Sequence, residues 1–234
     1  MKRLLFAQIG LILSLAISAQ SLEEITKKNF EASKQEAYDK AETVNITMKL
    51  FQQGMELSMN MLTKKPDKIR TTVLVQGMEI VTAFDGTKGW MINPMTGSSN
   101  PVEMPASDAA ALKNQSSFTA NISSLFKENR LELLGEQNVN GKPAWKIKAT
   151  LPTGDISNIY IDKASYLQVK ADARVAQMGM EMDVETYMTD YADFSGILMP
   201  KTITVYSNGT EMMVMMVDKV EVNKPVDDKM FTLK

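Results

Sequence analysis

Apolar and polar residues alternate one by one along much of this chain. The segments 44–50 and 55–61 both follow this pattern, and the second has methionine or leucine at each apolar position. Strict alternation is typical of a β-strand with one buried and one solvated face. Similar patterns predict further strands at 69–75, 78–84, 89–92, 131–137, 144–151, 156–161, 167–176, 178–188, 201–206 and 211–222.

Turn dipeptides separate many of these segments, at Gln76-Gly77, Asp85-Gly86, Asn140-Gly141 and Asn208-Gly209. Such dipeptides favour tight β-hairpins because both of their residues tolerate a positive φ. Successive hairpins with little helix between them predict an antiparallel meander rather than a βαβ fold.

Two regions break the alternation. Ser21 and Glu24 fit a capping box, and apolar residues then recur at helical spacing, so we predict one amphipathic helix that ends near Glu42. From Pro94 to Arg130 prolines and glycines indicate a loop, followed by short helices at 107–112 and 121–126. A separate loop is predicted later in the chain, around Asp190 and Asp193. A half-buried sheet face needs a second layer, so both helical regions are candidates for a lid.

Methionine is unusually frequent, with 19 in 234 residues. Met178, Met180, Met182 and Val184 share one strand face, opposite Glu181, Asp183 and Glu185, while residues 212–217 are apolar on both faces. Methionine is flexible and polarisable, which suits a surface that accommodates varied apolar partners. The alternative, that these side chains simply fill a core, is equally compatible with the pattern.

The first residues have the features of an export signal. A positive Met1-Lys2-Arg3 precedes an apolar run, and Ile17-Ser18-Ala19 forms a plausible cleavage site. The apolar run is shorter than the roughly 20 residues that span a bilayer. We predict a signal peptide at 1–19, a single domain at 20–234, and an exported protein that is soluble in the periplasm after cleavage.

Composition excludes several kinds of chemistry. The chain has no cysteine and no histidine, so thiol catalysis and Ser/His triads are impossible and the commonest zinc ligand is missing. The chain has no basic patch of the kind that would indicate nucleic acid as a partner. Paired carboxylates act in glycosidases only when they lie about 5–10 Å apart across a cleft, and no calcium-loop spacing is present. We predict no catalytic residue, no metal and no cofactor.

Four short motifs resemble those of one family. The string DGTKGWMINP at 85–94 resembles the "DG-x-x-x-W-x-Y-x-P" strand–turn–strand of the LolA superfamily, the periplasmic carriers of outer-membrane lipoproteins. Residues 64–70, 160–167 and 226–233 are similar to its other motifs, in the same order. Lys65 and Ile92 depart from the pattern, where better-studied carriers have an arginine and an aromatic residue.

The resemblance implies a mainly β fold with helices: an incomplete antiparallel β-barrel whose concave apolar face is closed by an N-terminal helix and a central helical lid. Acyl chains would bind between lid and sheet. Trp90 and Trp145 stand near turns, as packing anchors do, and Trp90 is also included in the predicted acyl-contacting set. That set is Met48, Met55, Leu57, Met59, Met61, Trp90, Met178, Met180, Met182 and Val184.

The implied function is a monomeric, non-enzymatic carrier that binds lipoproteins or lipids through their acyl chains. Its expected protein partners are an inner-membrane donor and an outer-membrane acceptor. Two alternatives stay open at this point: an envelope sensor or scaffold that shares the half-barrel and acts through a protein partner, and a carboxylate hydrolase of lipids or glycans.

Overall fold

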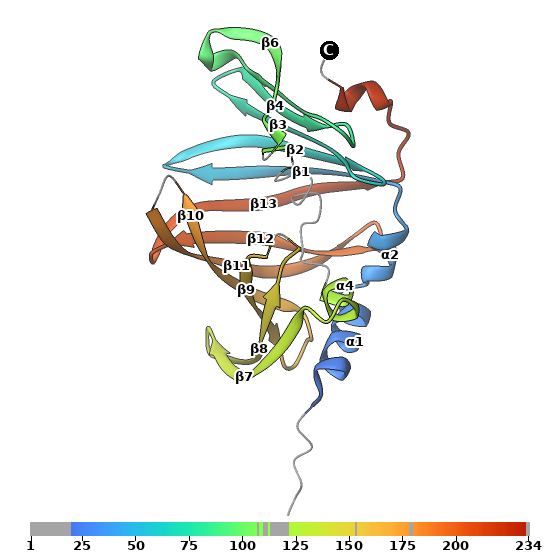
Figure 1. The fold of residues 1–234 in the computed structure, drawn as a ribbon, viewed down its shortest axis with the longest axis vertical. Helices are drawn as coiled ribbons and strands as arrows, with labels where there is room; N and C mark the ends of the chain where they lie inside the picture. Colours follow the sequence, from blue (N-terminus) through green and yellow to red (C-terminus); the bar gives the residue numbers. More distant parts are fainter. Residues whose placement is uncertain are drawn as a thin grey trace, which may run out of the picture.

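The computed structural model describes residues 20–106, 108, 109, 112, 122–152, 154–177 and 180–232. In this part of the chain one antiparallel sheet of 13 strands dominates, in the order β6-β5-β4-β3-β2-β1-β13-β12-β11-β10-β9-β8-β7. Neighbours in the sheet are neighbours in the chain except where β1 pairs with β13. The sheet curves but does not close, with β6 and β7 at its edges (Figure 1). The predicted meander and half-barrel are therefore confirmed.

The predicted strands all form, most of them within a few residues of their expected bounds. They are β1 (Thr43–Gln52), β2 (Met55–Lys64), β3 (Lys68–Val75), β4 (Met78–Phe84), β5 (Gly89–Asn93), β7 (Leu131–Val139), β8 (Lys142–Thr150), β9 (Ile156–Asp162), β10 (Gln168–Gln177), β11 (Met180–Phe194), β12 (Ile197–Ser207) and β13 (Thr210–Val222). The remaining strand, β6 (Ser98–Glu103), falls where a loop was predicted. It contains Pro101, which an edge strand tolerates because one side of its ladder is unpaired.

The predicted helices are only partly as expected. Instead of one N-terminal helix there are two, α1 (Leu22–Ala32) and α2 (Gln35–Lys40), because Lys34 adopts a left-handed conformation with φ 51°. The helix α4 (Ile122–Lys127) confirms the second central prediction. Half of the predicted helix at 107–112 lies outside the described residues, and the described residues 108, 109 and 112 are helical. Two 3-10 turns, η1 (Pro94–Thr96) and η2 (Asp228–Phe231), complete the described elements.

The predicted loop around Asp190 and Asp193 is wrong. Strand β11 runs through both residues to Phe194, and Asp190 has a positive φ of 55° at an interruption of the β11–β12 register. The hairpin turn instead lies at Ser195-Gly196, where φ is 56° and 90°. Thr189 pairs with Thr202 and Tyr191 with Pro200 in the same register on the two sides of Asp190, so the strand continues through this gap in the pairing without an extra residue.

The hairpin turns follow their sequences. Asn140-Gly141 has φ values of 49° and 83°, and Asn208-Gly209 has 48° and 78°, as type I′ turns require. The Asp85-Gly86 turn is different, because β4 ends at Phe84 and β5 begins only at Gly89. The Asp85 carboxylate accepts hydrogen bonds from the Thr87 and Lys88 amides at 2.9 and 2.8 Å, and so organises the loop.

This loop leads to a prediction about stability and pH. Burial alone would raise the pKa of Asp85, but hydrogen bonds from Lys88, Thr87 and Trp90 lower it from 3.8 to about 2. The stabilisation is therefore present above about pH 4 and is lost as the pH falls towards 2. We expect Asp85→Ala to reduce the unfolding free energy by about 1–2 kcal/mol at pH 7. Urea titrations should show the difference from wild type shrinking below pH 4; a constant difference would contradict this account.

Candidate functional site

The sheet has an inner face, defined by Val44, Ile46, Met48 and Leu50 on β1. Paired residues of an antiparallel ladder lie on the same face. The register therefore adds Met61, Met59, Leu57 and Met55 of β2 to the inner face on one side, and Val217, Met215 and Met213 of β13 on the other. The predicted alternation thus becomes one apolar surface that continues across neighbouring strands.

Burial of this inner face falls along the strands. On β2, Met61 is 6% exposed, Met59 and Leu57 are half-buried, and Met55 is 46% exposed. On β13, Val217 is buried while Met215 and Met213 are half-buried. The buried residues lie near α1 and α2, which we call the helix end, and the exposed ones lie near the turns at 53–54 and 208–209, which we call the hairpin end (Figure 1). The inner face is thus packed at the helix end and accessible at the hairpin end.

Most of the predicted acyl-contacting residues meet on this inner face. Met48, Met55, Leu57, Met59 and Met61 lie together on β1 and β2. Met182 and Val184 reach the same face of β11, because the register links Val184 to Ser207 and Thr186 to Val205 across β12. Met180 occupies a β11 position of the same parity, opposite Gln177. Met178 lies outside the described residues.

Trp90, also in the predicted set, does not lie on the inner face. It pairs with Ala83 on β4. The adjacent pair, Met91 with Thr82, is the one that the register places on the inner face. Trp90 instead packs with Val81, Ala83 and Ile92 on the outer face. Its role in the fold is that of a packing anchor.

Sequence reasoning left several inner-face residues out of the predicted set. Met213, Met215, Val205 and Val175 share the face by register, and Val175 is 37% exposed opposite Met182. The alternation of β13 contained the signal, but that strand is apolar on both faces, so parity alone could not decide which methionines point inward.

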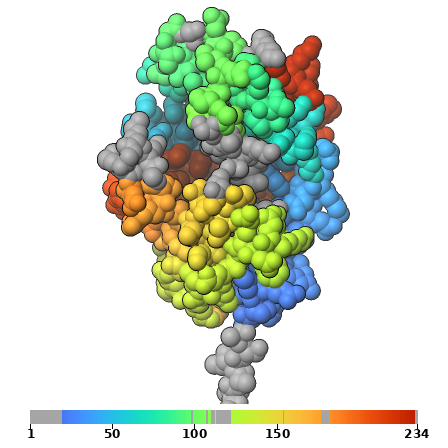
Figure 2. All heavy atoms as spheres, in the orientation of Figure 1, coloured from blue at the N-terminus to red at the C-terminus, as the bar shows by residue number. Residues whose placement is uncertain are grey.

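In Figure 2, seen from the inner side, atoms of β13 (dark red) lie recessed between the upper and lower parts of the sheet.

Short helices cover parts of the inner face. Ile25 of α1 and Ile122 and Leu125 of α4 pack against Trp145, Ile147 and Ile159, at one side of the sheet. Ala109 and Leu112 join the cluster around Ile46 and Met48 at the other side. The close approach of the Ala109 segment explains Gly89, where an added Cβ would come within 2.8 Å of the Ala109 Cβ. The predicted helical cover is therefore present on the inner face.

Helix α1 is firmly attached to the sheet through Tyr166, which lies in the β9–β10 turn. The Asn29 side chain donates to the Tyr166 carbonyl at 2.7 Å. The Gln20 and Lys28 side chains both donate to the Tyr166 hydroxyl, at 2.9 and 3.2 Å. The Tyr166 ring in turn stacks on Trp145 with centroids 5.1 Å apart. At the start of α1 the Ser21 hydroxyl accepts from the Glu24 amide at 3.2 Å, which confirms half of the predicted capping box.

Helix α2 is attached more weakly. It has six residues, none of them buried, and no side-chain cap at its N-terminus. An exposed ion pair between Lys34 and Asp193, 2.5 Å long, joins its start to β11, and Tyr38 packs against the apolar cluster. A cavity of about 30 Å³ lies between this helix pair and the sheet, and it is lined by neutral residues: Asn29, Ser33, Gln35, Tyr38, Ile122, Gln168, Tyr191, Ile197, Leu198 and Met199.

The difference in attachment between α1 and α2 predicts which of the two helices opens from the sheet. Segments with few buried apolar contacts open at low free energy, and exposed ion pairs contribute only about 0–1 kcal/mol. We expect the backbone amides of α2 to exchange with deuterium at least about tenfold faster than those of α1, measured by mass spectrometry on peptides. Equal exchange rates in the two helices would mean that they move as one unit.

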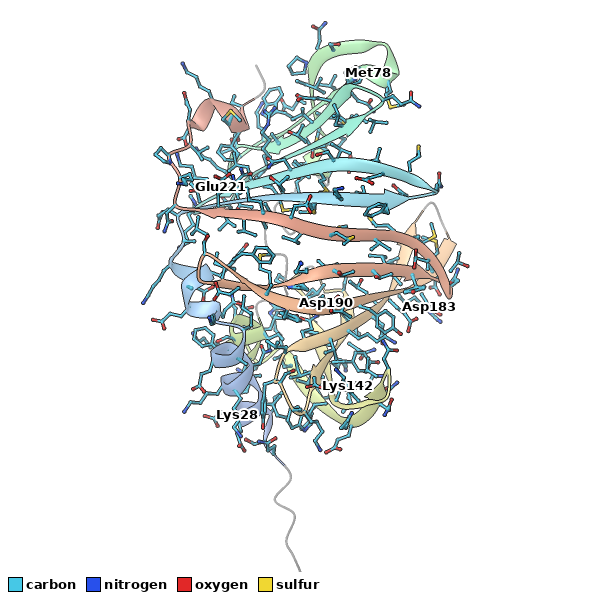
Figure 3. The ribbon with its side chains drawn as sticks, turned by 180° about the vertical axis from the view of Figure 1, so that it is seen from behind. Lys28, Met78, Lys142, Asp183, Asp190 and Glu221 are labelled. Atoms are coloured by element: carbon cyan, nitrogen blue, oxygen red, sulfur yellow. The ribbon has the colours of Figure 1, made fainter. Side chains whose placement is uncertain are left out.

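The β11 carboxylates that alternate with its apolar residues lie on the outer face, as does Asp172 of β10. Asp172, Asp183 and Glu185 line a groove of about 740 Å³ there, and Figure 3 shows Asp183 near the hairpin end of this face. Each has a partner: Asp172 accepts from the Tyr160 hydroxyl at 2.6 Å, Asp183 from Arg174 at 2.9 Å, and Glu185 from Lys170. Among the described residues no cluster of acidic side chains could hold a metal ion.

Comparison with known proteins places the chain in a family. Residues 56–234 match the model of a family described as "Uncharacterized protein". The chain belongs to this family. No curated protein matches the sequence. Within the described part of the chain, no helix is both long enough and apolar enough to cross a membrane.

Solved structures share the fold at low sequence identity. A LolA superfamily protein from Nitrosomonas europaea is 13% identical, with 91% of this chain and 98% of that chain covered and a TM-score of 0.60. A DUF1329 family protein from Desulfovibrio piger is 14% identical, with coverage of 92% and 100% and a TM-score of 0.60. A putative outer membrane lipoprotein-sorting protein domain from Vibrio parahaemolyticus is 12% identical, with coverage of 90% and 97% and a TM-score of 0.55. The fold is LolA-like, as the sequence motifs predicted.

Proposed function

We propose that this protein is a periplasmic carrier that binds the acyl chains of lipoproteins or lipids on its inner face and transports them towards the outer membrane. The observation that supports the proposal is the inner face itself. It is apolar across β11, β12, β13, β1 and β2, and its burial falls from Met61 to Met55 towards the hairpin end. An acyl chain could lie there along the strands.

The energetics favour such binding. Burying an acyl chain gains about 0.8 kcal/mol per methylene, so a chain of about ten methylenes gains roughly 8 kcal/mol before the cost of immobilising it. Flexible methionines such as Met59 and Met213 can pack on one another when the face is empty and rearrange around a ligand. The same surface therefore suits chains of different length.

The remaining parts of the proposal follow from the sequence and the fold. A signal peptide at 1–19 would export a single domain at 20–234, which would act as a monomer. An inner-membrane donor would load it and an outer-membrane acceptor would unload it. A protein domain of similar fold is named for lipoprotein sorting, and the partnered state of Asp172, Asp183 and Glu185 suits a structural role. We propose that the protein binds without catalysing a reaction.

A binding titration tests this function. Fluorescently labelled lipopeptide is titrated with the protein lacking residues 1–19, in parallel with the same peptide without its acyl chains. Saturable binding of the acylated form alone is expected. Equal affinity for both peptides would show that the methionines form an ordinary core, and would direct the search to a protein partner.

A further inference from the structure

One polar atom on the inner face stands out among the described residues. The hydroxyl oxygen of Thr71, on β3, is buried and has no hydrogen-bond partner in the part of the chain that the structure describes. The register places Thr71 between Met61 of β2 and Thr82 of β4, which puts it on the inner face two strands away from Met48. The hydroxyl therefore lies on the same face as the surface that we propose for acyl chains, one strand beyond β2 and beside Met61.

Other threonines show how this fold usually satisfies a hydroxyl. Thr63, on the same face of the neighbouring strand, donates to the Val44 carbonyl at 3.3 Å. Thr43 and Thr26 donate to main-chain carbonyls at 2.8 and 2.9 Å. A buried hydroxyl without a partner is costly, whereas valine has the same shape and pairs equally well in a strand. A partner from outside the chain would remove this cost.

We propose that Thr71 donates a hydrogen bond to the carbonyl oxygen of the ester or amide that attaches an acyl chain to its carrier molecule. This inference rests on the proposed function. An acyl chain brings one strong acceptor into an apolar site, and that acceptor is its carbonyl. The neighbours Met61, Ile69 and Val73 are apolar and provide no charge to balance an anion, and a buried carboxylate without a partner is strongly disfavoured. Thr71 therefore selects esters and amides over free fatty acids and over alkyl ethers.

The test compares two lysophosphatidylcholines of equal chain length, one with an ester-linked and one with an ether-linked chain. Both probes have the same head group, and only the ester has a carbonyl. The wild-type protein is expected to bind the ester about threefold to tenfold more tightly, as one net hydrogen bond would give. Thr71→Val should bind both probes with the affinity that wild type has for the ether. Thr71→Ser, which keeps the hydroxyl, should retain the preference.

Two further measurements make the result decisive. Thr204→Val is the matched control, because Thr204 pairs with Val214 on the outer face, and it should keep the ester preference. Thr71→Val should melt at the same temperature as the empty wild type or higher, since it removes an unpartnered hydroxyl; a lower melting temperature would show a partner within the protein and overturn the inference. Equal wild-type affinities for the two probes would overturn the inference alone. Binding of neither probe would overturn the proposed function as well.

Discussion

Replacing Met59 by glutamate is expected to lower the affinity for an acylated peptide at least about 100-fold. Met59 lies half-buried on the inner face, in register with Met48 on one side and Val73 on the other. A carboxylate at this position would keep water on the surface that we propose for acyl chains, because its desolvation without a partner costs several kcal/mol. Each 1.4 kcal/mol corresponds to a factor of ten in affinity. Titration with the labelled lipopeptide measures the loss directly.

The matched control is Met216→Glu. Met216 is 40% exposed on the outer face of β13, where it pairs with Lys49. The substitution makes the same change of charge on the same sheet, and a neighbouring lysine favours it, so binding should stay within about twofold of wild type. Equal losses in both variants would show that the charge, and not the face, matters, and would contradict the assignment of the inner face.

A variant near the hairpin end separates binding from folding. The substitution at Met59 also buries a charge in the folded protein, so circular dichroism and thermal melting must accompany the titration. Met55, which is 46% exposed on the same face, tolerates a charge without such a cost. We expect Met55→Glu to fold normally and to bind about tenfold more weakly. Normal binding by a folded Met55→Glu would place the acyl chain elsewhere.

The sequence was most informative where structure depends on neighbouring residues. Strand β4 has the predicted bounds, because alternation and the Gln76-Gly77 dipeptide are both local signals. The break between α1 and α2 could not be predicted this way, since apolar residues keep their helical spacing across it. Lys34 adopts its left-handed conformation beside Asp193, a residue 159 positions later in the chain.

Face assignment needed the same long-range information. Parity alone shows that Trp90 and Met91 point to opposite faces, but not which one is inward. That follows only from a chain of register pairs, from Met91 through Thr82, Thr71 and Met61 to Ile46. The inner face consequently includes the β2 methionines of the predicted set, whose strand alternates with polar residues, but not Trp90, whose neighbours on both faces are apolar.

The C-terminal motif that resembles the LolA superfamily has a structural role that the sequence did not specify. Asp228 forms ion pairs with Lys64 and Lys68, 2.6 and 2.8 Å long, and Arg70 donates to the Met230 carbonyl at 2.9 Å. All three basic side chains belong to the outer face of β2 and β3. The tail therefore packs on the side of the sheet opposite the inner face.

Phe231→Ala is expected to lower the unfolding free energy by about 3–5 kcal/mol, the usual cost of truncating a buried phenylalanine. Phe231 is fully buried, at 0% exposed, although it lies three residues from the end of the chain and its segment is a single 3-10 turn. Such a short turn has little stability of its own, so the ring must hold the tail on the sheet. Urea unfolding followed by circular dichroism measures the loss.

Met230→Ala is the matched control for this prediction. Met230 precedes Phe231 and is 43% exposed, so its truncation should cost less than about 1 kcal/mol. Because the tail lies on the outer face, Phe231→Ala should still bind acylated peptide at temperatures where it remains folded. Loss of binding by a folded Phe231→Ala would show that the two faces of the sheet are coupled, and that the tail contributes to the inner face as well as to stability.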